Sequence, residues 1–417
     1  MTDPEGPGLI LRARWLVPVA GRALAGGWLR LDRGRVTEIG QGPPPGPALD
    51  LGDVVLIPGL VNAHTHLEFS LVDRPLPADG GLPGWIGHLV ALRRGAAVDP
   101  QAHGRAVMAG LVESLAAGVT ALGEIATALH PGGPAITPRL RLYREALGLG
   151  PAALPRARAA LGSSTAPDSV VPDAPRIHPG ISPHAPYTVA GPLGLHLVAA
   201  ARRRRLPVAM HLAESVDESR LVDHDTGPFR ALLEGLGAWP DPPPALLPAA
   251  EWITLLARAP RGLVVHATFL AEAGHGALER LARHRHRLAV AVCPRTARLL
   301  SGTLPPVARL RTCGVRIALG TDGRGSAPDL DPRAECRALV EAGLVTPAEA
   351  LAMATVHAAW GIGLERVCGR LAPGRPGDVA VIATGPTADP HAALLDPAAP
   401  VVATLVGGRV AHGALPG

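Results

Sequence analysis

The chain has 417 residues, which is too long for one ordinary domain but fits an α/β barrel with a small appendage. Its formal net charge is +5, and all 40 basic residues are arginine because the sequence contains no lysine. The missing lysine excludes a Schiff base, a Walker A phosphate loop and a carbamylated lysine between two metals. We interpret the arginine content, with its excess of Ala, Gly, Pro and Leu, as coding bias and expect no nucleic-acid partner.

The cysteines and the N-terminus favour a reducing compartment. Cys293, Cys313, Cys336 and Cys368 are widely spaced and form no Cys-x-x-Cys pair, so neither a zinc ribbon nor a disulfide scaffold is predicted. The N-terminus "MTDPEGPGLI" lacks the basic and apolar regions of a signal peptide, and no apolar run reaches membrane length. We expect a cytoplasmic protein with no membrane partner, and the sequence leaves open whether copies associate into a homo-oligomer.

Short strands joined by Gly turns, without helices between them, are predicted at both ends of the chain. The N-terminal part contains "LILRARWLV", "GWLRLDRGRVTEIG" and "ALDLGDVVLIPG", and the tail repeats this texture in "GRPGDVAVIA" and "VVATLVGGRVAHG". We expect residues 1–57 and 372–417 to form one small β-sandwich-like domain beside the barrel.

Eight short apolar strands, each followed by a helical or loop segment, are predicted between these ends. They are "VVLIPGLVNAH", "VTALGEIA", "LRLYREALG", "IHPGISPH", "LPVAMHLAE", "GLVVHATF", "LAVAVCP" and "VRIALGTD". This alternation predicts a closed (β/α)8 barrel of the TIM type over residues 58–371.

The first of these strands runs into "PGLVNAHTHLEFS", where two histidines are separated by one residue. Side chains alternate along a strand, so His64 and His66 are expected on one face, with Glu68 continuing that face. Two imidazoles on one face can share a metal ion. His284 and His286 have the same spacing, but arginines flank them, so we interpret that pair as a surface turn.

Other predicted strands end in residues that can also bind a metal. Because barrel active sites lie at the carboxyl ends of the strands, His211, His266 and Asp322 should meet His64 and His66 there. Such a set of imidazoles and a carboxylate suits zinc or iron(II). Glu214 follows His211 by three residues and could carry a proton beside the metal, while His184 ends the fourth strand and is expected to meet the substrate.

The order of the motifs resembles the amidohydrolase superfamily, and within it the cytosine/adenosine deaminase and chlorohydrolase branch. The resemblance covers nearly the whole chain through "PGLVNAHTH", "SPHAPYT", "HLAE", "VVHAT", "CPR", "LGTD" and "GRLAPGRPGDVAVI". It implies one divalent metal ion, zinc before iron(II), with His64, His66, His211 and Asp322 as ligands. It also implies that Glu214, His266 and Asp322 act on the attacking water.

Within the branch, "HTHLEFS", "LPGWIGHLVALRR" and "CPRT…LGTDGRGSAPDLD" look most like aminodeoxyfutalosine deaminases of the alternative menaquinone route. The resemblance therefore implies hydrolytic deamination of a small molecule, 6-amino-6-deoxyfutalosine. The alternatives are a deaminase of adenosine or S-adenosylhomocysteine, a triazine-type chlorohydrolase, and a barrel scaffold that has lost catalysis. A scaffold would be expected to lack a ligand, whereas all four ligands and Glu214 are present.

Overall fold

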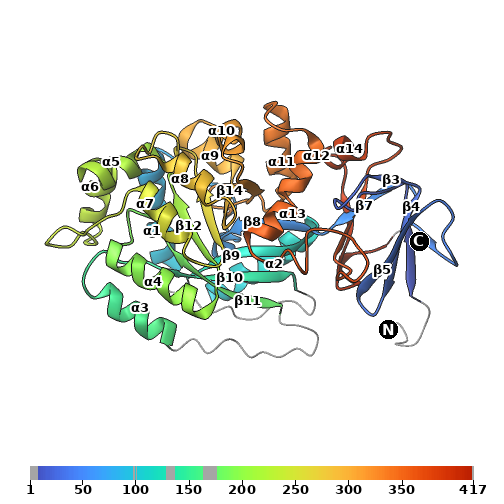
Figure 1. The fold of residues 1–417 in the computed structure, drawn as a ribbon, viewed down its shortest axis with the longest axis horizontal. Helices are drawn as coiled ribbons and strands as arrows, with labels where there is room; N and C mark the ends of the chain where they lie inside the picture. Colours follow the sequence, from blue (N-terminus) through green and yellow to red (C-terminus); the bar gives the residue numbers. More distant parts are fainter. Residues whose placement is uncertain (1–7, 97–98, 100, 128–136, 163–175, 416–417) are drawn as a thin grey trace.

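The computed structural model describes residues 8–96, 99, 101–127, 137–162 and 176–415. A barrel with surrounding helices forms the larger part, and strands from both ends of the chain form a smaller part beside it (Figure 1). Within these described residues, no helix is long and apolar enough to span a membrane.

Eight parallel strands form the barrel sheet, in sequence order around the ring. They are β8 (Leu60–Thr65), β9 (Val119–Ala126), β10 (Arg139–Ala146), β11 (Ile177–Pro183), β12 (Val208–Leu212), β13 (Gly262–His266), β14 (Leu288–Val292) and β15 (Arg316–Leu319). A parallel bridge between Thr65 and Asp322 joins β8 to the segment after β15 and closes the ring. The predicted TIM-type barrel is confirmed. The first predicted strand, "VVLIPGLVNAH", is divided, because Val54–Pro58 form a strand of another sheet and only the part from Leu60 enters the barrel.

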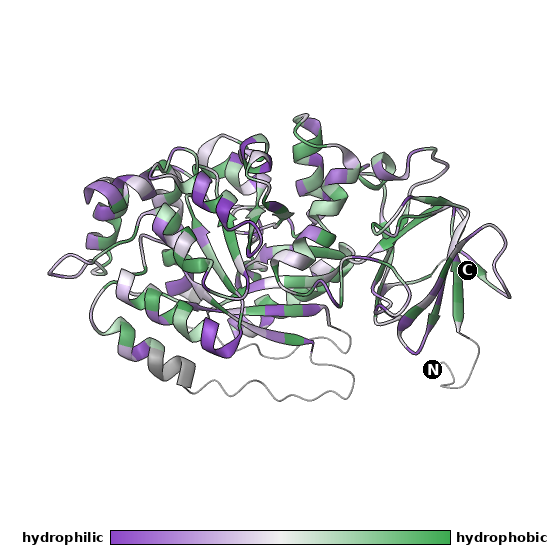
Figure 2. Ribbon diagram, viewed as in Figure 1, coloured by the Kyte–Doolittle hydropathy of each residue, from purple (hydrophilic) through white to green (hydrophobic). Residues whose placement is uncertain are grey.

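The two faces of the barrel strands pack differently. In β13, Leu263 and Val265 belong to a core inside the barrel that is rich in alanine, whereas Val264 packs into the layer between barrel and helices. Figure 2 shows the barrel strands mostly hydrophobic, while the outer helix α5 (Val216–His224) carries many hydrophilic residues. Both faces of the strands are thus buried, which explains their nearly continuous apolar sequences.

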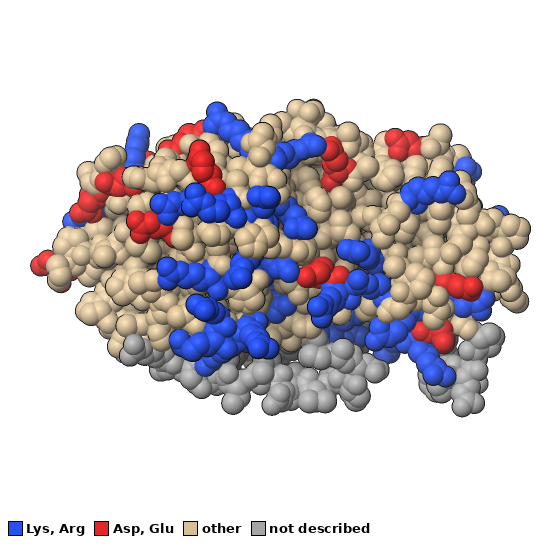
Figure 3. All heavy atoms as spheres, viewed as in Figure 1, with Lys and Arg blue, Asp and Glu red and all other residues tan. Residues whose placement is uncertain are grey.

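The outer helices follow the strands along the chain. They are α1 (Gly81–Ala96), α2 (Ala102–Ala116), α3 (Ala153–Gly162), α4 (Gly191–Arg204), α5, α6 (Pro228–Gly235), α7 (Ala249–Leu256), α8 (Ala277–Arg283), α9 (Pro294–Ser301), α10 (Val307–Thr312), α11 (Pro332–Glu341) and α12 (Pro347–Met353). Helix α13 (Val356–Gly361) instead contributes Ala358 and Ala359 to the core inside the barrel. In α4, Leu193, Leu197 and Ala201 recur at helical spacing and are buried, and three arginines occupy the last turn. Figure 3 shows arginines spread over the visible face with acidic residues between them.

Two sheets make up the smaller part. One has the order β5-β4-β1-β6 and the other β18-β17-β16-β7-β2-β3. Their strands are β1 (Leu9–Arg12), β2 (Trp15–Leu16), β3 (Leu24–Ala25), β4 (Gly27–Asp32), β5 (Arg35–Gln41), β6 (Leu49–Asp50), β7 (Val54–Pro58), β16 (Val379–Ala383), β17 (Val401–Val406) and β18 (Arg409–Gly413), with the short helix α14 (Pro390–Leu394) between β16 and β17. The expected β structure from both termini is therefore confirmed.

Leu29, Leu56 and Val381 share one hydrophobic core in this smaller part, so residues from both ends of the chain are packed together. The chain leaves its six-stranded sheet with β7 and enters the barrel with β8. We propose a domain division at residues 57/58 and 371/372 on this basis.

A buried ion pair connects the two parts. Arg139, which begins β10, donates from Nε to Oδ2 of Asp378 at 2.8 Å and from Nη2 to Oδ1 at 3.3 Å. The backbone N–H of Gly407 donates to the same Oδ1 at 2.7 Å. Both side chains are buried, so removing either Arg139 or Asp378 would leave the other charge buried without a partner.

Candidate active site

Four histidines from three barrel strands converge at the carboxyl end of the barrel. His64 and His66 come from the end of β8, His211 from β12 and His266 from β13. The Nε2 atoms of His66 and His211 lie 3.2 Å apart, and the ring of His64 lies 4.9–5.5 Å from the other three ring centres. All four residues are buried, so their imidazoles face one another away from bulk water.

Asp322 supplies the carboxylate of this cluster. Its Oδ1 lies 3.2 Å from Nε2 of His64 and 3.6 Å from Nε2 of His66, while its Oδ2 accepts a hydrogen bond from the hydroxyl of Ser326. The backbone of Asp322 has φ +59, in the left-handed region that non-glycine residues seldom occupy. His266 has φ +69. Strained conformations of this kind cluster at functional sites.

Burial sets the charge of the imidazoles. Desolvation lowers the pKa values of His66, His211 and His266 well below the ordinary value, so these rings are neutral at pH 7. Burial alone would raise the pKa of Asp322, but the hydrogen bond with His64 and the neighbouring imidazoles hold it below its usual range. Neutral imidazoles and an ionised carboxylate are the forms that bind a metal ion.

The donor atoms satisfy the spatial requirement for a metal site. The ligand atoms of His64, His66 and His211 lie within 4.8 Å of one another, and so do those of His64, His266 and Asp322. The Nδ1 atom of His211 is 2.9 Å from the backbone carbonyl of His184. A neutral His211 that donates from Nδ1 keeps its lone pair on Nε2, which faces His66. The donor set therefore fits one divalent cation.

Glu214 lies beside the cluster in the segment that follows β12. Its Oε1 is 3.3 Å from Nε2 of His266, and only 9% of the residue is exposed. Burial first, and then the charges of Asp322 and Glu218, raise the pKa of Glu214 well above its ordinary value. A carboxyl group of this kind can hold a proton at neutral pH and exchange it with a bound molecule.

The backbone before Glu214 is held by Glu218 on α5. The carboxylate of Glu218 accepts the backbone N–H of Ala213 at 2.7 Å, and Ala213 has φ +53. The contact fixes a left-handed turn between the strand that carries His211 and the residue that carries the carboxyl group.

His184 follows β11 and contacts His211 of this cluster through its backbone carbonyl and through its ring. Its carbonyl oxygen lies against Nδ1 of His211, and its own Nδ1 lies 2.6 Å from Oγ1 of Thr188. The ring lies 5.0 Å from the His211 ring. Burial lowers the pKa of His184 to about 3, so the imidazole is neutral and can exchange hydrogen bonds with a ligand.

Two buried glutamates at the barrel rim were not predicted. Glu145 near the end of β10 lies 3.9 Å from Nε2 of His184, and burial raises its pKa to about 7. Neither of its carboxyl oxygens has a hydrogen-bond partner within the described part of the chain. Glu124 in β9 accepts the backbone N–H of Leu67 at 3.1 and 3.2 Å. Each lies within the last three residues of its barrel strand, so a search of all strand ends for titratable residues would have found both.

The expectation that Glu68 continues the face of His64 and His66 is wrong. The strand ends at Thr65, and Leu67–Phe69 form a short 3-10 helix. The carboxylate of Glu68 instead accepts from Nη2 of Arg93 at 2.7 Å. The alternation of a strand does not extend past the point where its backbone turns.

The clustered side chains open into a cavity of about 210 Å³. Its polar lining includes His66, His184, His211, Glu214, His266 and Asp322. Helices α1 and α6 supply an apolar wall that includes Trp85, Leu89 and Phe229. The indole N–H of Trp85 donates to the carbonyl of Gly325 at 2.9 Å, so this ring is fixed in place. The site thus joins a polar reaction centre to an apolar binding surface.

The second histidine pair lies elsewhere. His284 follows α8, and both His284 and His286 precede β14, at the amino end of that strand and therefore at the opposite end of the barrel. His286 is exposed and His284 is partly exposed. The surface interpretation of this pair is confirmed.

Comparisons with known proteins agree with this architecture. The chain is 27% identical over 392 residues to a 5-methylthioadenosine/S-adenosylhomocysteine deaminase of Moorella thermoacetica, covering 90% of this chain and 85% of the relative. Among solved structures, aminofutalosine deaminase of Helicobacter pylori in complex with methylthio-coformycin matches with a TM-score of 0.82 at 22% identity, over 97% of this chain and all of the other.

An adenosine deaminase from Xanthomonas campestris, solved with bound zinc, matches with a TM-score of 0.72 at 22% identity, over 99% of this chain and 95% of the other. These structural similarities support the fold. The description of the amidohydrolase family matches residues 55–411, nearly the entire sequence. Together with the rim of histidines and Asp322 on a TIM-type barrel, this match shows that the chain belongs to the amidohydrolase family.

Proposed function

We propose that the protein is a metal-dependent hydrolytic deaminase of a 6-amino purine nucleoside, with 6-amino-6-deoxyfutalosine as its substrate. The observation that carries this proposal is Glu214, a buried carboxyl group 3.3 Å from Nε2 of His266 and beside the cluster of His64, His66, His211 and Asp322. These four residues would hold one divalent ion, zinc before iron(II). When bound, such an ion supplies Lewis-acid chemistry that makes water nucleophilic at neutral pH.

The remaining chemistry belongs to side chains of this chain. Glu214 accepts the proton of the attacking water and delivers it to the ring nitrogen next to the amino-bearing carbon. His266 donates toward the oxygen of the tetrahedral centre, where charge develops, and Asp322 orients the water. The carbon–nitrogen bond then breaks, ammonia leaves, and a carbonyl group remains on the ring.

The residues that line the cavity favour a nucleoside that carries an additional substituent as the ligand. His184 lines the cavity next to the metal cluster, where a hydrogen bond to the purine or sugar can be made. The wall of α1 and α6 offers apolar contacts beyond it. The sequence relative of Moorella thermoacetica is named for 5-methylthioadenosine and S-adenosylhomocysteine, which favours a purine nucleoside over a cytosine or triazine ring.

Ammonia release from candidate substrates tests the proposal. We expect the highest kcat/KM with 6-amino-6-deoxyfutalosine, when it is compared with adenosine, 5-methylthioadenosine, S-adenosylhomocysteine, guanine, cytosine and a chlorotriazine. A higher kcat/KM with S-adenosylhomocysteine or 5-methylthioadenosine would support the proposed deaminase reaction but contradict the proposed substrate. Chloride release from the triazine without deamination would show that the protein is a chlorohydrolase instead. Absence of turnover of every compound by the metal-loaded protein would support the catalytically inactive scaffold.

A further inference from the structure

The second carboxylate oxygen of Asp322 is engaged away from the histidines. The hydroxyl of Ser326 donates to Oδ2 of Asp322, and the hydroxyl of Thr296 lies 2.9 Å from the same Ser326 oxygen. Thr296 is 1% exposed and Ser326 is 2% exposed, so no bulk water competes for these contacts. Ser326 also lies 3.3 Å from the carbonyl oxygen of Gly323, a longer alternative for its proton.

The chemistry of the three groups fixes the direction of the hydrogen bonds. An ionised carboxylate only accepts, so the proton of Ser326 is committed to Asp322. The hydroxyl of Thr296 must then donate to Ser326, which gives a chain of two hydroxyls that ends on a charge. Hydrogen bonds in such a chain polarise one another, and the bond to the carboxylate is strengthened.

This arrangement gives the two oxygens of Asp322 different environments. Oδ1 faces His64 at 3.2 Å and His66 at 3.6 Å, whereas Oδ2 faces the two hydroxyls. The terminal torsion of an aspartate is broad, so a carboxylate without such partners rotates readily. Here the rotation would break a buried hydrogen bond to a charged group.

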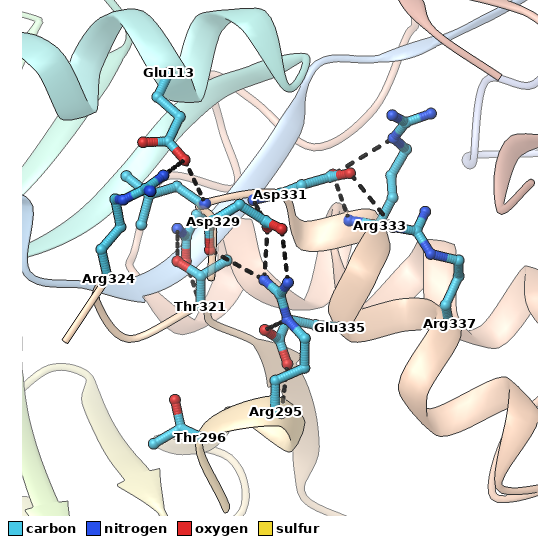
Figure 4. Close-up of polar contacts among 12 residues, drawn as sticks. Glu113, Arg295, Thr296, Thr321, Arg324, Asp329, Asp331, Arg333, Glu335 and Arg337 are labelled. Carbon is cyan, nitrogen blue, oxygen red and sulfur yellow. Dashed lines mark hydrogen bonds and ion pairs between the residues drawn. The ribbon is translucent and has the colours of Figure 1, made fainter. Parts of the chain in front are cut away.

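The loop that carries Asp322 and Ser326 is itself held at several points. Arg295, the residue before Thr296, donates to Asp329 at 2.8 and 2.9 Å and also pairs with Glu335 on α11 (Figure 4). On the other side, Arg324 donates to Glu113 of α2 at 3.0 Å (Figure 4). Thr296 and Ser326 therefore approach each other from two anchored segments.

We propose that Thr296 and Ser326 are positioning residues that hold the Asp322 carboxylate with Oδ1 toward the metal-binding histidines. This proposal concerns how the ligand is oriented and goes beyond the proposed function, although it rests on the same metal site. Ser326 lines the cavity but gives its proton to Asp322, whereas Thr296 is not part of the cavity lining and acts only through Ser326.

Isosteric variants of the zinc-loaded full-length protein test this positioning. Thr296→Val removes the hydroxyl and keeps the shape, and Thr296→Ser keeps the hydroxyl. We expect Thr296→Val and Ser326→Ala to speed zinc loss to a chelator and to lower kcat, each by about 10- to 100-fold as is typical when a partner of a ligand is lost. KM should change by less than about twofold, and Thr296→Ser should restore both properties.

The double variant distinguishes a hydrogen-bond chain, in which Thr296 acts through Ser326, from two side chains that contribute independently by packing. If Thr296 acts through Ser326, Thr296→Val combined with Ser326→Ala should be no worse than Ser326→Ala alone. Thr404→Val is the matched control, because Thr404 in β17 of the smaller part is buried and donates to the carbonyl of Leu115 in α2. It should leave zinc loss and kcat unchanged.

Additive effects in the double variant, or zinc loss at the wild-type rate in Thr296→Val, would overturn the proposal. A fall in melting temperature of the metal-free Thr296→Val protein without faster zinc loss would also overturn it, because it indicates packing alone. Zinc loss is measured without substrate, so this outcome is independent of whether the wild-type protein deaminates the proposed nucleoside.

Discussion

The Nε2 atoms of His66 and His211 face each other at 3.2 Å. His211 donates from Nδ1 to the carbonyl of His184, so its Nε2 lone pair points toward His66. The Nδ1 atom of His66 has no hydrogen-bond partner among the described residues. Two buried neutral imidazoles at this distance are best satisfied by one cation between their lone pairs.

We predict one metal ion per chain, bound by His64, His66, His211 and Asp322. The double variant His64→Ala/His66→Ala should retain little or no metal, because it removes two of the four donors. Elemental analysis of purified protein after removal of loose metal provides the measurement. The double variant His284→Ala/His286→Ala has the same change at the other end of the barrel and should keep one ion. A ratio near two in active wild-type protein would contradict this prediction.

Glu214→Gln should lower kcat by about 10²- to 10⁴-fold, because the amide keeps the size of the side chain but cannot accept and deliver the proton. The variant should still bind one metal ion, since Glu214 contacts His266 and not the proposed ligands. Steady-state ammonia release and elemental analysis of the same sample give both values. Loss of the metal from this variant would make Glu214 a ligand and overturn its assigned role.

His184→Ala should raise KM and lower kcat/KM by about tenfold, because a partly buried ring that lines the cavity is removed. Metal content should not change. The contact between His184 and His211 uses the backbone carbonyl, which alanine retains. Metal loss on this substitution would show that the ring supports the cluster directly.

Removal of one partner from the buried ion pair between Arg139 and Asp378 should destabilise the protein strongly, in contrast to the same change in a surface pair. Arg139→Met leaves a buried carboxylate without its cation, which typically costs about 3 to 5 kcal/mol. Unfolding in urea gives the free energy. Arg309→Met is the control, because Arg309 pairs with Glu272 on the surface at 3.2 Å and should change stability little. Equal effects of the two substitutions would contradict the buried-pair argument.

Glu218 should make stability depend on pH. Burial raises the pKa of Glu218 to about 8, above its value of about 4.5 in the unfolded chain. Between these values the folded protein holds a proton that the unfolded chain releases, so the contribution of Glu218 to stability falls as pH rises from about 4.5 to about 8. We expect urea unfolding of Glu218→Gln to be less sensitive to pH over this window. A wild-type protein that loses no more stability than the variant would be evidence against this raised pKa.

Strand-end residues were predictable from the sequence by itself. Because side chains alternate along a strand and parallel strands of a barrel end at one rim, His64, His66, His211, His266 and Asp322 could be brought together without coordinates. Local apolar patterns likewise determined the eight strands and the β structure at both ends. These features depend on short-range periodicity and on the small number of ways in which alternating strands and helices can pack.

Contacts between distant segments were decided only by the tertiary structure. Glu68 turned away to Arg93 because a short helix replaced the strand, and Glu145 became a buried acid because neighbouring strands enclose it. Ser326 and Thr296 meet across 30 residues of chain because the loop after β15 packs against the start of α9. Such contacts depend on the path of the backbone and on burial, and neither quantity has a local signature in the sequence.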